Sequence, residues 1–428
     1  MISRTYLQLL AIALIGYVVM GRDFASIGAG PVYIGELIVA LGALVLLVRL
    51  PSTVDLFRQP TVWLLSAFMI LGLCRTLPYL PAYRLMALRD GVLYGYALIA
   101  FATAVALPRR GTAERAVRGY ARFARLFPAW VLVSTIVALA SGLAFLTRPG
   151  ETGVALACIL AFAALLTQSG KYSVWYWMVW CCAFVLRCGD SRASFVAVGL
   201  VAVVIALHAS ASRWIRLCGA VVLLAYPLLV TDAQLQIGGR TISVKKLVSV
   251  AQSVSTDKSK DVHGGTNEWR LKWWNKIVGY TVNGPYFWSG KGFGVNLADD
   301  DGFQILEDGS LRSPHNSHLT VLARMGVPGF LLWLALHLCF ALSMWMKYIE
   351  NRMKNRASTA NLYLWVLCAW LASVGNASFD VAFEGPQSAI WFWSVFGFGL
   401  ALIQNERAGP LLGSRRVYVQ GRPGAARM

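Results

Sequence analysis

Charged residues are scarce in this sequence. Asp, Glu, Lys and Arg make up 14% of its 428 residues, whereas a soluble domain carries about 25%. Hydrophobic residues account for 57%, and apolar runs long enough to span a membrane recur along the chain. So few charges cannot cover a soluble surface. The sequence therefore excludes an ordinary soluble enzyme and predicts an all-α polytopic membrane protein.

Signatures of disulfide, metal and nucleotide chemistry are missing as well. The eight cysteines fall in or beside apolar runs, and no HExxH, P-loop or cysteine-ligand spacing occurs. Asp299, Asp300 and Asp301 adjoin one another, but consecutive side chains of an extended loop point in different directions and make a poor metal cage. We expect a solvated acidic stretch there, no metal site and no cofactor.

About twelve apolar runs predict membrane-spanning helices, interrupted by one long polar loop. The runs lie near residues 5–21, 31–49, 60–76, 89–107, 126–146, 151–168, 172–188, 193–209, 214–231, 318–346, 360–379 and 388–404. We expect four regions: helices 1–9 in residues 1–231, a large external loop in 232–317, helices 10–12 in 318–404, and a basic cytoplasmic tail in 405–428.

The net charge of +19 does not indicate a nucleic-acid partner. The basic residues lie in short bursts between apolar runs, which is the pattern of membrane topology with membrane lipid as the nearest partner. With the N-terminus in the cytoplasm, most of the basic residues in short connections fall inside, as the positive-inside rule requires. The long loop is then outside.

Several arginines on the outer side run against this rule. Each one alone fits a side chain that snorkels at a helix end, but together they predict an anionic ligand. The planar guanidinium forks bind phosphate well and stay ionised, so a diphosphate is the natural candidate. Acids at the outer helix ends, such as Asp90, are expected to neutralise some of them. The set is Arg75, Arg84, Arg89, Arg187, Arg192, Arg270 and Arg312.

Two segments around the loop carry further candidates. In residues 313–330 (SPHNSHLTVLARMGVPGF), Pro314 is expected to start a helix, so that His315 and His318 share one face. A neutral imidazole accepts a proton from a sugar hydroxyl, and Asn316 is expected to orient a ring or a substrate hydroxyl. Residues 267–276 predict an amphipathic helix whose tryptophans suit either the membrane interface or a sugar ring. They are Trp269, Trp273 and Trp274.

Taken in order, these pieces resemble the bacterial O-antigen ligase and O-antigen/exopolysaccharide polymerase superfamily, which are membrane glycosyltransferases of the GT-C class. Residues 315–319 followed by 326–329 are similar to the family's HN..L…G.PG signature, and residues 290–294 resemble its G.GFG turn. Residues 190–193 are similar to its SR motif, and Arg270 with Trp273 to its R..W helix. Residues 21–36 resemble its opening segment.

The resemblance implies a glycan donor linked to undecaprenyl diphosphate, in the bacterial inner membrane, with the active site facing the periplasm. A hydroxyl of another glycan or of lipid A core displaces the lipid diphosphate without metal or nucleotide. The resemblance implies His315 as the base, with Arg192 and Arg270 holding the diphosphate, so these three must meet at one cavity. Charge and position add five substrate-binding candidates: His318, Asn316, Arg89, Arg312 and Arg75.

Other functions remain open at this point. The shared motifs do not separate a ligase from a polymerase, since the two differ in their acceptor. A peptidoglycan polymerase also has a large outer loop, but the paired histidines argue against it. A transporter or flippase of an anionic lipid-linked substrate would predict charged or helix-breaking residues near the middle of several spans, whereas most ionisable residues here sit at the ends. A purely structural assembly partner would leave the histidines and arginines unexplained.

Overall fold

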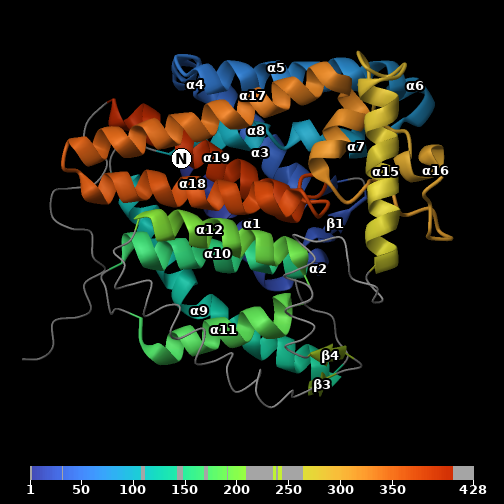
Figure 1. The fold of residues 1–428 in the computed structure, drawn as a ribbon. Coiled ribbons are helices and arrows are strands. Elements are labelled where there is room, and N and C mark those ends of the chain that lie inside the picture. Colours follow the sequence, from blue (N-terminus) through green and yellow to red (C-terminus); the bar gives the residue numbers. More distant parts are fainter. Residues whose placement is uncertain are drawn as a thin grey trace, which may run out of the picture.

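The computed structural model describes residues 2–30, 32–107, 111–141, 148–167, 172–189, 191–208, 235–237, 240–242 and 264–407. Nearly all of its regular structure is helical, and most of the long helices run roughly along one direction (Figure 1). Its strands form two short antiparallel hairpins, β1 with β2 and β3 with β4. The predicted span at 214–231, Asp190 of the predicted SR motif and the tail from 408 lie outside the described residues.

The N-terminal part of the chain contains the elements from α1 to α12. They are α1 Ile2–Met20, α2 Arg22–Ala25, β1 Gly28–Ala29, β2 Val32–Tyr33, α3 Ile34–Val48, α4 Leu50–Leu56, α5 Pro60–Thr76, the 3-10 helix η1 Leu77–Tyr79, α6 Leu80–Tyr83, α7 Leu85–Gly95, α8 Leu98–Ala106, α9 Thr112–Ser141, α10 Pro149–Leu166, α11 Val174–Cys188 and α12 Arg192–His208. The remaining elements are β3 Leu235–Ile237, β4 Arg240–Ile242, α15 Gly264–Val282, α16 Leu297–Asp301, α17 Ser317–Met353, α18 Ala357–Ala377 and α19 Pro386–Glu406.

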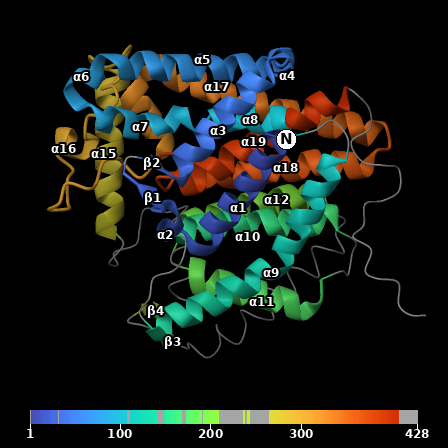
Figure 2. The same ribbon diagram turned by 180° about the vertical axis from the view of Figure 1, so that it is seen from behind.

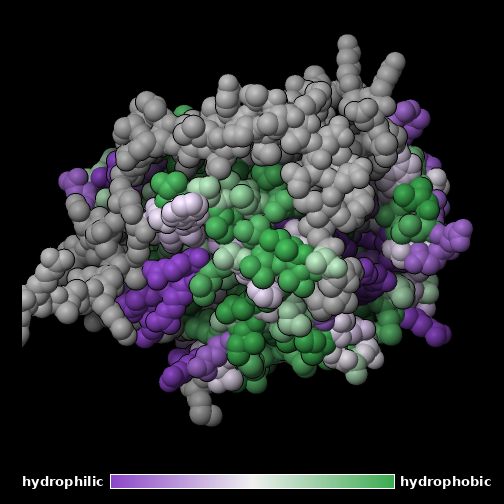
Figure 3. Space-filling view, turned by 90° about the horizontal axis from the view of Figure 1, so that it is seen from below, coloured by the Kyte–Doolittle hydropathy of each residue, from purple (hydrophilic) through white to green (hydrophobic). Residues whose placement is uncertain are grey.

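The helices confirm an all-α polytopic membrane protein. Among the described residues, seven helices are long and apolar enough to cross a membrane, or up to nine if two bent pairs each count as one span. The pairs are α3 with α4, bent by 95°, and α7 with α8, bent by 45°. The helices α11 and α12 are apolar but shorter, so the number twelve stays a prediction. One face of the molecule carries hydrophobic residues between hydrophilic patches toward both ends (Figure 3), as a membrane-spanning surface requires.

Helix α9 begins earlier than the predicted span at 126–146. It starts at Thr112 and therefore includes an arginine-rich stretch that was expected to be a connection. The physical reason is amphipathicity: Val117, Ala121 and Ala124 are buried at helical spacing, while the arginines at 115 and 118 are exposed. One apolar stripe thus continues the helix beyond its spanning part.

Packing in the bundle depends on close approach of small and aromatic side chains. A Cβ at Gly153 of α10 would lie 2.5 Å from the Ser194 side chain of α12, so small residues let these helices meet, as is common in membranes. On the other side, Phe340 of α17 stacks on Phe396 of α19 with ring centroids 3.9 Å apart. Helix α17 lies beside α5 and α18 in both ribbon views (Figures 1 and 2).

Helix α15 crosses one end of the bundle at a steep angle and packs on α17 (Figures 1 and 2). Its Trp273 is fully buried and stacks on Phe303, and the indole Nε1 donates to Asp301 Oδ2 at 2.7 Å. Trp269 packs beside Trp273 in the same small core. Trp273 therefore stabilises the packing of α15 on α16, and its predicted role in membrane anchoring or sugar stacking is wrong. Trp269 is only partly buried, so its role stays a prediction.

The acidic stretch in the loop is only partly solvated. Asp299 and Asp300 are exposed as expected, but Asp301 is 1% exposed and forms an ion pair with the buried Lys291. The same Lys291 ammonium lies 4.1 Å from the centre of the Tyr280 ring. A buried carboxylate needs a paired cation and hydrogen bonds. Asp301 of α16 finds them in Lys291 of the glycine-rich turn at 290–294 and in Trp273 of α15, and it thus links these three parts.

Candidate active site

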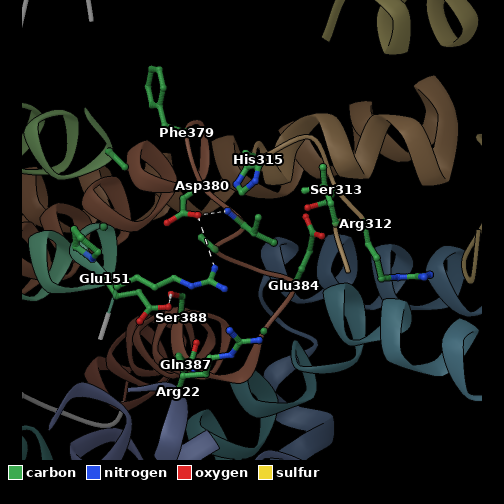
Figure 4. A pocket seen from close by; sticks show the side chains of 18 of the residues that line it. Arg22, Glu151, Arg312, Ser313, His315, Phe379, Asp380, Glu384, Gln387 and Ser388 are labelled. Carbon is green, nitrogen blue, oxygen red and sulfur yellow. Dashed lines mark hydrogen bonds and ion pairs between the residues drawn. The ribbon is translucent and has the colours of Figure 1, made fainter. Parts of the chain in front are cut away.

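A cavity of about 700 Å³ lies between α15 and the N-terminal ends of α10, α12 and α19 (Figure 4). Helix N-termini carry partial positive charge and favour anions. Seven arginines from separate parts of the chain add full positive charges, and four carboxyl groups accompany them. The arginines are Arg22, Arg89, Arg148, Arg192, Arg270, Arg312 and Arg324, and the acids are Asp90, Glu151, Asp380 and Glu384. The excess of arginine makes the cavity suited to an anion.

His315 lines this cavity from the residue just before α17. Its backbone has the left-handed φ of 53°, which is uncommon for a residue with a side chain. The helix begins only at Ser317, because the Asn316 side chain accepts hydrogen bonds from the amides of His318 and Leu319 at 3.0 and 3.1 Å and so caps it. The predicted helix start at Pro314 is therefore wrong.

His318 does not share a face with His315, because only His318 belongs to the helix. Its Nδ1 accepts a hydrogen bond from Trp333 Nε1 at 3.0 Å, and its Nε2 lies 3.2 Å from the Val374 carbonyl oxygen. Both ring nitrogens are thus engaged, Nδ1 within α17 and Nε2 at α18. Neither His318 nor Asn316 is among the cavity-lining residues. The structure gives His318 packing contacts and Asn316 a capping role, and it does not place either one at the cavity with His315.

Arg192 and Arg270 reach the cavity from different elements. Arg192 is the first residue of α12, and Arg270 lies in the first half of α15. The Nε of Arg270 is buried and has no hydrogen-bond partner among the described residues. A buried donor without a partner is costly, and it becomes satisfied if an anion enters the cavity. The structure therefore brings together the three residues that the family resemblance singles out.

Electrostatics keep the His315 ring neutral. Burial and then the charge of Arg270 lower its pKa from 6.5 to about 4, with Asp380 acting in the opposite direction and Arg148 adding a smaller decrease. The pKa of Arg270 is itself lowered, first by burial, although a guanidinium stays protonated. At neutral pH the cavity thus holds a neutral imidazole with a free lone pair beside permanent cations.

Asp90 organises the opposite part of the cavity. Its Oδ2 lies 2.9 Å from Nη2 of both Arg312 and Arg324, and it also accepts the Gly294 amide at 3.0 Å. Asp90 thus neutralises arginines as expected, but its partners come from the predicted loop (Arg312 and Gly294) and from α17 (Arg324). Arg89, its neighbour on α7, also lines the cavity.

Arg75 is the remaining candidate, and it is not among the cavity-lining residues. It lies on α5 and its Nη2 donates to the Trp288 carbonyl oxygen at 2.6 Å. This contact ties α5 to the turn after α15. Conversely, the sequence arguments did not single out Arg22, Arg148 or Arg324 as site residues, because an arginine at a helix end or in a short connection looks topological until the fold is known.

Fold and cavity together define a polytopic membrane protein with an arginine-rich cavity and a neutral histidine at one end of its helix bundle. Residues 177–334 match the family model described as O-antigen ligase, so this part of the chain is similar to that family. The match supports the superfamily that the sequence motifs resemble, and it indicates an O-antigen ligase-type membrane glycosyltransferase from a bacterial membrane. It includes Arg192, Arg270 and His315. A search of curated proteins found no match.

Proposed function

We propose that the protein transfers a glycan from an undecaprenyl-diphosphate-linked donor to a hydroxyl of an acceptor, at the outer face of the bacterial inner membrane. One observation carries the proposal: a neutral His315 lines the same cavity as Arg192 and Arg270. A base and an anion-binding pair are the two parts that this reaction needs. The family match adds a lipid-linked glycan and an acceptor as the general kinds of partner.

The proposed step displaces the lipid diphosphate in one substitution. The acceptor oxygen forms a bond to the anomeric carbon while the bond from that carbon to the diphosphate oxygen breaks. His315 takes the hydroxyl proton, and the bonding electrons leave with the diphosphate. Arg192 and Arg270 stabilise that developing charge, for which donors fixed in a water-poor site are most effective. General-base help of this kind contributes about 10²- to 10⁴-fold in rate.

In this proposal arginines supply the positive charge that a diphosphate leaving group requires, so the reaction proceeds without a metal. Whether the acceptor is lipid A core or another lipid-linked glycan distinguishes a ligase from a polymerase. The acceptor-binding surface decides this, and the diphosphate site is the same in both.

The test is transfer of glycan from purified undecaprenyl-diphosphate donor to each acceptor, with EDTA and without nucleotide. We expect product with the wild type, and a loss of about 10²- to 10³-fold in rate for Arg192→Ala and a comparable loss for His315→Ala. Arg58→Ala, at an exposed pair with Asp55, is the control and retains activity. Elongated lipid-linked chains identify a polymerase, and glycosylated lipid A core identifies a ligase. Substrate movement across vesicles without any product would instead establish a transporter.

A further inference from the structure

The cavity is rich in hydrogen-bond donors and poor in free acceptors. Arginines only donate, and a sugar hydroxyl that is to be held in place needs an acceptor for its proton. Four carboxyl groups line the cavity, and we asked which of them are already engaged. Asp90 is saturated by Arg312, Arg324 and the Gly294 amide.

Two more carboxyl groups have partners. Glu151 Oε1 accepts a hydrogen bond from the Ser388 hydroxyl at 3.2 Å. Asp380 Oδ1 accepts the Val381 amide at 2.8 Å and lies 4.0 Å from Arg148 Nη1. These three contacts are drawn as dashed lines in Figure 4. These groups therefore hold the cavity wall together.

Glu384 is different. Its Oε1 is buried and has no hydrogen-bond partner in the part of the chain that the structure describes, although the residue lines the cavity. It follows α18 and comes just before α19, whose first residue is Pro386. The hydroxyl groups of Thr320 and Ser313 lower the pKa of its side chain, and Figure 4 shows it beside Ser313 on the wall that also carries His315.

The surroundings of Glu384 leave this carboxyl group polar but unsatisfied. Burial raises its pKa, the charge of Arg324 and the two hydroxyls lower it, and Asp90 raises it again. A buried acceptor without a partner costs free energy in the empty protein. A ligand that donates a hydrogen bond to Oε1 removes that cost, so the site favours a hydroxyl-bearing molecule over the diphosphate, which has only acceptor oxygens.

We propose that Glu384 binds the acceptor glycan by accepting a hydrogen bond from one of its hydroxyl groups at Oε1. The cavity is then divided by chemistry. Arg192 and Arg270 take the diphosphate, and Arg270 offers it the unpartnered donor at its Nε. Glu384, with an unpartnered acceptor at Oε1, takes the acceptor sugar. His315 lies in the same cavity and receives the proton of the attacking hydroxyl. The inference rests on the proposed transfer function and assigns it an acceptor-binding residue.

The test separates the two substrates kinetically. Initial rates are measured with the acceptor that supports transfer, for wild type, Glu384→Gln and Glu384→Ala, and binding of undecaprenyl diphosphate is measured separately. We expect Glu384→Ala to raise the KM for the acceptor by about 10- to 100-fold, as loss of a hydrogen bond to a charged group does. Undecaprenyl diphosphate binding stays unchanged. Glu384→Gln, which keeps an acceptor oxygen, loses less.

A second measurement excludes a merely structural role. Monodeoxy analogues of the acceptor, each lacking one hydroxyl, are compared in wild type and Glu384→Ala. One analogue should have a raised KM with the wild type. Its KM should rise no further with Glu384→Ala, because the missing hydroxyl and the substitution remove the same hydrogen bond. Glu350→Gln, far along α17 in a cluster with Lys347 and Lys354, is the matched control and changes neither KM.

The outcomes are distinguishable. An unchanged KM for the acceptor in Glu384→Ala, or a change confined to undecaprenyl diphosphate binding, overturns this inference and leaves the transfer function standing. Additive losses for every deoxy analogue also overturn it. Failure of the wild type to transfer glycan to any acceptor contradicts the proposed function, and this inference falls with it.

Discussion

A histidine with a low pKa is a proton acceptor over an unusually wide pH range. Since the pKa of His315 is lowered to about 4, the ring protonates only when the pH approaches that value. We therefore expect the acid limb of kcat/KM, which reports the free protein, near pH 4 and well below the ordinary 6.5. The measurement is kcat/KM for transfer as a function of pH, over a range in which the unfolding midpoint is constant.

Donor binding should shift this limb. A diphosphate beside Arg270 offsets part of the positive charge that lowers the pKa of His315, so the pKa rises in the complex. The acid limb of kcat, which reports the complex, is then expected at higher pH than that of kcat/KM. Coincident limbs would show that the diphosphate does not lie near His315.

Single site residues were predictable to different degrees. His315, Arg192 and Arg270 were identified from short motifs that the family shares, and the structure places all three at one cavity. Glu384 and Asp380 could not be singled out in this way, because the sequence does not reveal which carboxyl is left without a partner. His318 and His315 have the same side chain, so the sequence does not distinguish their roles. They differ because α17 begins at Ser317, which places His318 in the helix and His315 before it.

At the scale of elements, the cap of α17 determines where His315 lies. Asn316→Ala removes the side-chain acceptor for the amides of His318 and Leu319, and we expect it to cost about 1 kcal/mol. Asn316→Asp keeps an oxygen in place and should retain both stability and transfer activity. Thermal unfolding of the detergent-solubilised protein and the transfer assay check this. Loss of activity in a fully stable Asn316→Asp would assign the amide a direct role with substrate, as the sequence alone suggested.

The kink in α17 rests on a glycine. Gly326 has a φ of 69°, and a Cβ there would collide with the Phe287 carbonyl oxygen. The Val327 amide donates to that same carbonyl at 2.8 Å, so the kink joins α17 to the turn after α15. Gly326→Ala should therefore lower the unfolding temperature and the transfer rate together.

Gly279 of α15 provides a matched control for this kink. Nothing lies within 4 Å of a Cβ added there, so Gly279→Ala should leave the protein unchanged or slightly more stable. Equal stability of the Gly326 and Gly279 variants would contradict the structural role of the kink.

Helices were easier to predict than their ends and bends. Apolar runs mark where a chain lies in a membrane, because that signal is a sum over about twenty residues. Two features were not predicted: the bend of 95° between α3 and α4 and the early start of α9. Both depend on contacts with other helices, and a local apolar run carries no information about such contacts. Trp273 of α15 was misassigned for the same reason, since an apolar stripe does not show whether lipid or protein covers it.

At the scale of the whole molecule, Asp90 connects the helix bundle to the segment at residues 283–312, between α15 and α17. It lies on α7 and holds Arg312 from the segment before α17, Arg324 within α17 and the amide of Gly294 in the glycine-rich turn. Arg324 is 2% exposed and also donates to the carbonyls of Gly292 and Val295. Removal of this one negative charge takes the carboxylate partner from a buried cation, Arg324, and from a partly buried one, Arg312. The elements that shape the cavity lie on both sides of this contact.

Asp90→Asn is accordingly expected to destabilise the protein by about 3–5 kcal/mol, the usual result of removing one partner of a buried ion pair. Asp55→Asn removes a carboxylate from an exposed pair and should change stability little. Unfolding midpoints of both variants in detergent measure the difference, and limited proteolysis tests whether this segment detaches first. Early cleavage between 283 and 312 with an intact helix bundle would show that Asp90 fastens the segment. The contrary outcome is that Asp90→Asn has the same unfolding midpoint as Asp55→Asn and shows no earlier cleavage. The segment must then be held chiefly by the Lys291–Asp301 pair and the core around Trp273. In that case Arg312 and Arg324 are available to bind substrate.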